Sequence, residues 1–308
     1  MILEILIYVF VAIFGLCIGS FLNCVIYRME QKKSLGGRSF CPHCKHALSW
    51  LDLFPVFSFI FLGGKCRFCK EKISWQYPLV EITTAILFVL IFNKLGVIPN
   101  LIGNPDFVKS GLTWIPAFAG MTRGGVGMMI YSAFWFYIAS SLIIIFVYDL
   151  KHYLIPDKVL FPAIIITFLY RLVGIFWIPA FAGMTEKYTG MTRGGVEMTG
   201  FLGNYIFAAI LGGGFFLLIF LISKGAAMGF GDVKLAVLMG LLLGLPKVLV
   251  ALFLAFFFGA IIGVILMAFK KKGLKSEIPF GPFLIAGTFT ALFWGEQLIT
   301  YYMHLFQI

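Results

Sequence analysis

Two aspartates, Asp149 and Asp232, each lie where a long apolar segment meets a short polar turn. An ionisable side chain is costly at a membrane boundary, so its presence there indicates a function and a partner group. If both turns face the same side of a membrane, the two carboxylates can meet and share one proton. Such a pair supplies one acid and one base, which together can activate water for hydrolysis of a peptide bond.

The residues around both aspartates favour tight turns. Gly229 and Gly231 precede Asp232 and give the backbone the freedom to turn and to present the carboxylate. Pro156 stops the helical pattern shortly after Asp149. Both carboxylates are therefore expected at the ends of helices, where water can enter.

The alternative interpretation of the aspartates is structural. Each could cap a helix or pair with the lysine two residues away, which is Lys151 for Asp149 and Lys234 for Asp232. Spacing alone leaves the catalytic and the structural interpretations open. Asp157 stands just before an apolar run and is expected to begin a helix.

A second group of residues suited to chemistry consists of two Cys-x-x-Cys pairs in one polar segment: Cys41, Cys44, Cys66 and Cys69. Their separation is typical of a zinc ribbon, in which four thiolates close a tetrahedral shell. Disulfides are the competing use, but a reducing compartment, which the charge pattern below indicates, disfavours them. Because four cysteines leave no open position, we expect a structural zinc ion. His43 or His46 could replace a ligand, although exposed loop histidines are the preferred interpretation.

The elements that must position these residues are membrane helices. Of the 308 residues, 61% are hydrophobic and 12% are charged, a composition that favours several membrane spans over a soluble domain. The first apolar run lacks a basic leader and a cleavage site, so we expect it to be retained as a span. Apolar runs occur near 2–27, 78–98, 128–148, 159–176, 201–223, 235–245, 248–269 and 280–303. We predict an all-α polytopic membrane protein with about eight transmembrane helices, or seven if the short run 235–245 does not cross.

The basic residues indicate the orientation of these helices. Most of the 24 Lys and Arg residues lie in 28–77, 149–158, 224–234 and 270–279, and the rest, Arg171 included, are assigned to outer loops and span ends. By the positive-inside rule the first group is cytoplasmic and the N-terminus lies outside. Both aspartates and the cysteine pairs then face the cytoplasm. The net charge of +11 is therefore interpreted as a topology signal, and no nucleic-acid partner is expected.

Two further acidic residues need an interpretation. Asp52 lies in segment 48–64, between the cysteine pairs, and is expected to begin a helix. The segment itself is too apolar for a free linker and too short for two crossings, so it either dips into the membrane interface or packs on the spans as a lid. Glu81 lies inside the second apolar run, where it must face protein or water, and is a candidate auxiliary site residue.

Several long motifs carry a family resemblance. They are the stretches 15–28, 50–69, 73–88 and 278–287, the Ile-Pro-Asp that follows Asp149, and the Gly-Phe-Gly-Asp-Val-Lys-Leu that contains Asp232. Together they resemble the bacterial type IV prepilin peptidases, the leader peptidases of type IV pilus and type II secretion systems. The resemblance extends over nearly the whole chain.

The resemblance implies that Asp149 and Asp232 are the catalytic aspartates of a GxGD-type intramembrane aspartic protease of the bacterial inner membrane. Its substrates would be prepilins and pseudopilins, cut in the lipid bilayer interface after the glycine that closes a basic leader. Family members often N-methylate the new N-terminal residue with S-adenosylmethionine, and the four-cysteine domain is implicated in that activity. Gly19, Ser20 and Asn23, which belong to the first motif, either allow close helix contacts or simply pack the first span.

The predicted organisation is a first transmembrane helix (1–27), a cytoplasmic four-cysteine domain with zinc-ribbon-like form (28–77), and a transmembrane protease core (78–308). Insertions near 99–127 and 177–200, which share the repeat WIPAFAGMT, are expected to face outward without a role. Two other functions compete: an ion- or proton-coupled transporter that uses the same aspartates, and a zinc-stabilised scaffold. Inverted repeats of broken helices would favour transport, and the sequence has no such symmetry.

Overall fold

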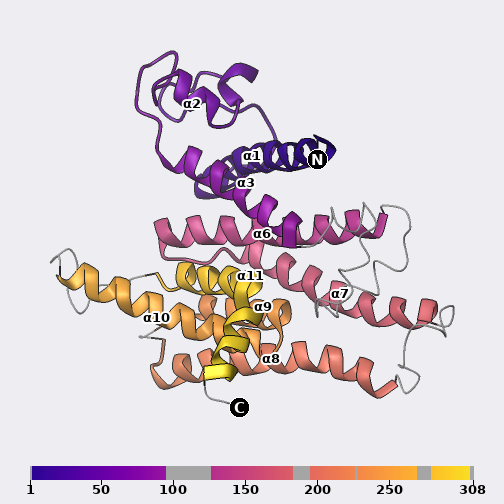
Figure 1. The fold of residues 1–308 in the computed structure, drawn as a ribbon. Coiled ribbons are helices and arrows are strands. Elements are labelled where there is room, and N and C mark those ends of the chain that lie inside the picture. Colours follow the sequence, from indigo (N-terminus) through magenta and orange to yellow (C-terminus); the bar gives the residue numbers. More distant parts are fainter. Residues whose placement is uncertain (1, 95–125, 183–194, 226–227, 269–278, 306–308) are drawn as a thin grey trace. The chain divides into compact units, whose positions relative to one another are not determined.

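The structure is a computed structural model, and it describes the chain except for residues 1, 95–125, 183–194, 226–227, 269–278 and 306–308 (Figure 1). The chain divides into two compact units, Met1–Ile144 and Ile145–Ile308, and the boundary falls inside one long helix. Across the described residues the regular structure is helical, with two isolated β-bridges. The predicted all-α class is confirmed.

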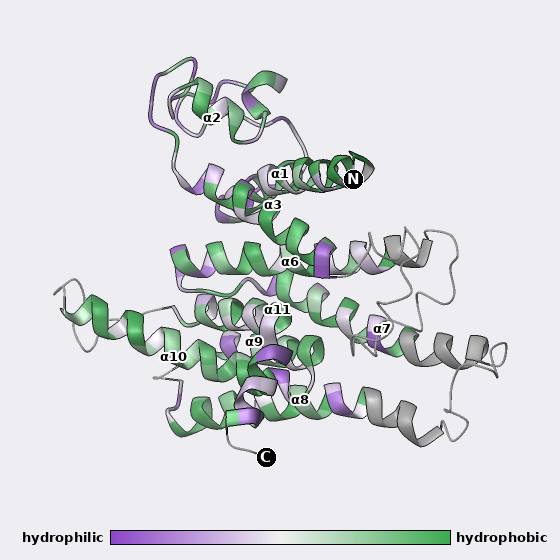
Figure 2. Ribbon diagram, viewed as in Figure 1, coloured by the Kyte–Doolittle hydropathy of each residue, from purple (hydrophilic) through white to green (hydrophobic). Residues whose placement is uncertain are grey.

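Each of the eight apolar runs corresponds to a helix in the described residues. Their bounds are α1 (Ile2–Glu30), α3 (Gln76–Lys94), α6 (Val126–His152), α7 (Asp157–Ala182), α8 (Gly195–Ile222), α9 (Phe230–Leu243), α10 (Lys247–Ala268) and α11 (Gly281–Leu305). Within the part of the chain that is described, six are long and apolar enough to cross a membrane: α1, α3, α6, α8, α10 and α11. Figure 2 shows these helices to be predominantly hydrophobic. The chain is therefore a multi-pass membrane protein.

In the first unit, α1 lies directly against α3. A Cβ atom on Gly19 would lie 2.6 Å from the Cα atom of Glu81, so a side chain at this position would force the helices apart. The side-chain amide of Asn23 donates a hydrogen bond to the carbonyl of Tyr77 at 3.0 Å. Gly19 and Asn23 thus serve a helix–helix contact, which was one of the two predicted roles.

The residues between α1 and α3 form a small domain that contains two short helices, η1 (Trp50–Leu53) and α2 (Phe57–Phe61). Each cysteine pair lies in a knuckle closed by an isolated antiparallel bridge. Phe40 pairs with Ala47 in the first knuckle, and Lys65 pairs with Lys72 in the second. This form is zinc-ribbon-like, as predicted.

In the second unit, α9 packs against α7, α8 and α11 but is too short to span a bilayer. Its 14 residues extend about 21 Å, whereas a hydrocarbon core is about 30 Å thick. A Cβ atom on Gly240 would collide with the backbone of Ala209, so α9 and α8 approach closely. The short length agrees with the predicted alternative of a half-span.

Two polar side chains complete the hydrogen bonding at the end of α9. The guanidinium of Arg171, on α7, donates to the carbonyls of Leu241 at 3.2 Å and Leu242 at 2.7 Å. The amide of Asn204, on α8, donates to the carbonyl of Leu245 at 3.1 Å and accepts from its N–H at 3.2 Å. A helix end in apolar surroundings needs such partners. Arg171 is buried on these carbonyls, a contact that the sequence did not indicate, and its assignment to an outer span end stays a prediction.

The two predicted insertions lie largely outside the described residues. The first, 99–127, overlaps only the beginning of α6. The second, 177–200, begins within the last turns of α7 and ends within the first turns of α8.

Candidate active site

Asp149 and Asp232 come from the ends of two helices in the second unit. Asp149 lies in the last turn of α6, and Asp232 lies in the first turn of α9. The N–H of Asp232 donates to the carbonyl of Gly229 at 3.2 Å, which closes the turn that starts the helix. Only 4% of Asp149 and 9% of Asp232 is exposed. Both aspartates thus lie at helix ends, as predicted, and both are buried.

A set of short contacts brings the two aspartates to one place. A Cβ atom on Gly281, the first residue of α11, would lie 2.5 Å from Oδ2 of Asp149 and 3.4 Å from Cδ1 of Ile155. A Cβ atom on Gly231, next to Asp232, would lie 3.0 Å from Cβ of the same Ile155. The two carboxylates are close enough to interact electrostatically. Three helix ends therefore converge on the pair.

The Asp149 carboxylate is incompletely satisfied by the protein. The backbone N–H of Gly281 is directed toward it, but its Oδ2 atom is buried and has no hydrogen-bond partner among the residues that the structure describes. A buried oxygen of this kind is costly unless a ligand or a reaction uses it. The pair can therefore receive a polar group such as a water molecule.

Lys234, the lysine nearest to Asp232 in the sequence, pairs with a different carboxylate. Its Nζ lies 2.7 and 2.9 Å from the two carboxylate oxygens of Asp157, and it also lies over the rings of Phe161 and Phe230. Asp157 begins α7, as predicted. The alternative in which Lys234 is the ion-pair partner of Asp232 is wrong.

The four cysteines converge in the first unit. Their Sγ atoms all lie within 4.8 Å of one another, and those of Cys41 and Cys69 are 3.9 Å apart. A tetrahedron with metal–sulfur bonds of about 2.3 Å has edges of about 3.8 Å, so the donor set fits a zinc ion. Hydrogen bonds from the backbone N–H groups of Cys69 and Phe68 lower the pKa of Cys66 to about 7. A backbone hydrogen bond from Glu71 lowers the pKa of Cys69, but burial and the neighbouring thiols outweigh it and raise that pKa to about 11. A bound metal ion would favour the thiolate form of all four cysteines. All six cysteines of the chain are free thiols.

The two nearby histidines are not part of this cluster. The ring of His46 packs on the ring of Phe68 with centroids 3.6 Å apart, and His43 is exposed. Neither joins the group of potential metal ligands within the described residues. The prediction of exposed loop histidines is confirmed.

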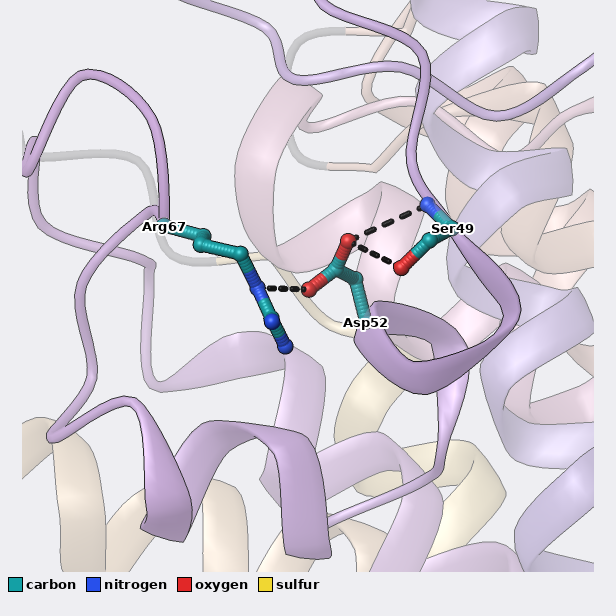
Figure 3. A network of polar contacts seen from close by, with 3 residues as sticks. All are labelled: Ser49, Asp52 and Arg67. Carbon is teal, nitrogen blue, oxygen red and sulfur yellow. Dashed lines mark hydrogen bonds and ion pairs between the residues drawn. The ribbon is translucent and has the colours of Figure 1, made fainter.

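Asp52 belongs to a local network of polar contacts (Figure 3). Its Oδ2 accepts hydrogen bonds from the N–H and the hydroxyl of Ser49 at 3.1 and 2.6 Å, and its Oδ1 accepts one from Nε of Arg67 at 2.9 Å. Burial alone would raise the pKa of Asp52, but these hydrogen bonds and the charge of Arg67 outweigh it and hold the pKa below its usual value. Asp52 thus stabilises the start of η1, as predicted, and ties η1 to the second knuckle.

Glu81 is buried in the first unit, where its Oε2 accepts a hydrogen bond from the N–H of Val56 at 2.7 Å. It faces protein, as predicted. Val56 belongs to the cysteine domain, so this contact connects that domain to α3, and the side chain of Ser20 on α1 is a second partner of Glu81.

Gly281 and Ile155 were not singled out from the sequence as site residues. The available signal was the Gly281-Pro282 step at the start of a spanning helix, since a residue without a Cβ atom can mark a close approach. Nothing in the sequence near Gly281 indicates that the approaching group is the carboxylate of Asp149.

The fold and the site define a class of protein: a multi-pass membrane protein with two buried, adjoining carboxylates at helix ends and a four-thiol domain after its first helix. Two family models match the chain. The bacterial peptidase A24 N-terminal domain matches residues 13–95, and the type IV leader peptidase family matches residues 136–264. Together the two matches cover more than half of the chain. The chain belongs to the type IV leader peptidase family.

Similar proteins from several bacteria are named prepilin leader peptidase/N-methyltransferase. The one from Bacillus subtilis (strain 168) is 29% identical, over 95% of this chain and 96% of its own. The one from Legionella pneumophila is 27% identical, over 96% and 94%. The one from Pseudomonas aeruginosa is 27% identical, over 94% and 91%. No solved structure matches the chain.

Proposed function

We propose that the protein cleaves the basic leader peptide from type IV prepilins and pseudopilins, with Asp149 and Asp232 as its catalytic pair, and then N-methylates the new N-terminal residue. The observation that carries this proposal is the convergence of two buried carboxylates around Gly281 and Ile155. The matched family and the names of the relatives support the substrate class and the second activity.

The two carboxylates divide the work of hydrolysis. Two like charges at short range favour a state with one shared proton. The ionised carboxylate accepts a proton from water, while the protonated one donates a hydrogen bond to the scissile carbonyl. The water oxygen then bonds to the carbonyl carbon. The tetrahedral intermediate collapses when a proton passes to the leaving amine, which breaks the C–N bond.

The position of the pair suits a substrate with a polar leader and an apolar helix. Asp149 lies in the last turn of a spanning helix, so the reaction takes place at the membrane boundary. A prepilin presents its cleavage site at the same depth, and its helix need not be pulled across the membrane. We assign this boundary to the cytoplasmic face of the bacterial inner membrane, with the N-terminus outside, because the distribution of Lys and Arg along the sequence assigns the loops next to both aspartates to that face.

The cysteine domain holds a structural zinc ion through Cys41, Cys44, Cys66 and Cys69, and binding of the ion stabilises the knuckles. Following the family resemblance, we assign the methylation step to this domain. S-adenosylmethionine would supply the methyl group to the amine of the cleaved pilin, leaving S-adenosylhomocysteine and a released proton.

The test uses the full-length protein in lipid nanodiscs with a prepilin and S-adenosylmethionine, and it reads the product by mass. Asp149→Asn and Asp232→Asn are expected to abolish cleavage while the protein remains inserted. Glu296→Gln, which makes the same acid-to-amide change in α11, is the matched control and is expected to retain cleavage. Retained cleavage in either aspartate variant would remove that residue from the pair.

The same experiment separates the competing functions. A transporter would leave the prepilin mass unchanged and would show aspartate-dependent ion flux. A scaffold would show neither product nor flux. A product that lacks the leader and carries one additional methyl group supports both proposed activities.

A further inference from the structure

The cysteine domain carries a large apolar surface that its own fold does not cover. Residues 50–61, which include η1 and α2, expose most of their large side chains: Trp50, Leu51, Leu53, Phe54, Phe57, Ile60 and Phe61. Phe61 is 85% exposed and Trp50 is 73% exposed. Contiguous apolar surface of this kind marks an interaction site. We propose that segment 50–61 lies at the boundary between the headgroups and the acyl chains of an anionic bilayer leaflet, as a membrane contact additional to the spanning helices.

The hydrogen bond between Val56 and Glu81 sets the depth of this segment relative to α3. Glu81 lies five residues into α3, which corresponds to about 7 Å along the helix axis. The 19 residues of α3 are only just enough to cross a bilayer, so the helix must use its full length. The backbone of Val56 is bonded to Glu81 at 2.7 Å and therefore lies below the end of a spanning helix. Lipid surrounds such a helix at this depth.

The backbone of Val56, the residue that donates the hydrogen bond to Glu81, is strained. Val56 has φ 60° and ψ −48°, a conformation that is unfavourable for a β-branched residue. The hydrogen bond to Glu81 helps to hold it there. The Asp52 network with Ser49 and Arg67 holds the other end of the segment (Figure 3). The apolar side chains are thus presented from a segment anchored at two points.

The charges around the segment favour anionic lipid as the occupant. Residues 31–75 contain eight exposed Lys or Arg residues: Lys32, Lys33, Arg38, Lys45, Lys65, Arg67, Lys70 and Lys72. The acidic residues in this stretch are Asp52, which is already paired with Arg67, and Glu71. A basic surface beside apolar and aromatic side chains is typical of elements that lie in the bilayer interface.

Lys65 and Lys72 belong to this basic surface. They oppose each other in the antiparallel bridge of the second knuckle, and both are exposed. The exposed ammonium group of each lysine can bind a phosphate oxygen of a lipid headgroup. A basic prepilin leader or a second copy of this basic domain would instead be repelled by the eight basic residues. The observations therefore favour phospholipid over either protein partner.

The experiment places a photoreactive side chain on the segment in the full-length protein. Phe61→p-benzoylphenylalanine is reconstituted in nanodiscs of phosphatidylcholine alone or with phosphatidylglycerol, irradiated, and analysed by mass. We expect lipid adducts in both, with a yield several-fold higher when phosphatidylglycerol is present. The matched control is the same probe at Ala47, which is exposed on the first knuckle and outside the segment, and it is expected to give several-fold fewer lipid adducts.

A second variant tests the role of charge. Lys65→Gln combined with Lys72→Gln, in the Phe61 probe background, is expected to reduce the gain from phosphatidylglycerol at least twofold while leaving the zinc content unchanged. Equal labelling at Phe61 and Ala47, or equal yields from the two lipid mixtures in the unmodified charge background, would overturn the proposal. Adducts formed with an added prepilin or with a second copy of the chain, in place of lipid, would overturn it as well. Prepilin cleavage is not the readout, so failure of this proposal is distinguishable from failure of the proposed function.

Discussion

The ammonium group of Lys234 lies close to both carboxylate oxygens of Asp157, at 2.7 and 2.9 Å, and so joins the start of α7 to α9. Asp157 follows Ile155 by two residues, and Lys234 follows Asp232 by two residues. The ion pair therefore connects the loop after Asp149 with the helix that carries Asp232. It is a contact suited to positioning the two aspartates.

Removal of this ion pair is expected to slow cleavage more than it destabilises the protein. Asp157 is half exposed, so the pair contributes less than about 1 kcal/mol to stability. Lys234→Met is expected to lower kcat for prepilin cleavage by several-fold, because the carboxylates lose their alignment, with little change in KM. The measurement is a double-mutant cycle with Asp157→Asn. If the double variant loses as much as the sum of the two single losses, the residues do not act together.

A side chain at Gly281 is expected to disable cleavage. In Gly281→Ala the new Cβ atom would lie 2.5 Å from Oδ2 of Asp149, so the carboxylate must move. A displacement of about 1 Å at a reacting group can cost about 100-fold in rate. The assay is prepilin cleavage by the purified variant. Gly214→Ala, in α8, is the matched control because its Cβ atom would meet nothing within 4 Å. Full activity in Gly281→Ala would exclude the close approach to Asp149.

Loss of one cysteine ligand is expected to release the metal. Cys41→Ser and Cys66→Ser each leave three thiolates, which weakens the tetrahedral site and loosens both knuckles. Zinc content of the purified protein is the measurement, with limited proteolysis of residues 31–75 as the structural readout. Cys17→Ser is the control because Cys17 is exposed on α1 and lies outside the cluster. Unchanged zinc in both ligand variants would reject the metal site.

Replacement of Arg171 is expected to destabilise the second unit. Arg171→Met retains much of the apolar stem but leaves the carbonyls of Leu241 and Leu242 without their donors. An unsatisfied buried carbonyl costs about 1–3 kcal/mol, so the thermal midpoint in detergent is expected to fall. Lys158→Met, at an exposed position on the same helix, provides the comparison. A midpoint equal to that of Lys158→Met would show that these bonds are dispensable.

The sequence was sufficient to predict the helices and the placement of both aspartates at helix ends. A membrane span needs about 20 apolar residues, and this requirement leaves a strong and local signal. The cysteine spacing was equally informative, because ligands in a knuckle are close together in the chain. The turn residues Gly229 and Pro156 predicted where α9 begins and where α6 ends.

Contacts between distant segments were not predictable in the same way. The nearest acidic residue in the sequence suggested that Lys234 pairs with Asp232, but the packing of α9 on α7 gives it Asp157. Arg171 was interpreted as a topology signal because its charge is visible in the sequence and its burial is not. Gly281 approaches Asp149 only once α11 is placed, and no local pattern encodes that placement.

The end of α9 is held by hydrogen bonds to the side chains of Arg171 and Asn204, which belong to the neighbouring helices α7 and α8. These contacts therefore set the depth of Asp232, at the other end of α9, in the membrane. A bilayer with longer or shorter acyl chains can tilt the surrounding spans at modest cost. It does not change the length of α9, which separates Asp232 from these contacts. We therefore expect the cleavage position along a substrate to be insensitive to membrane thickness.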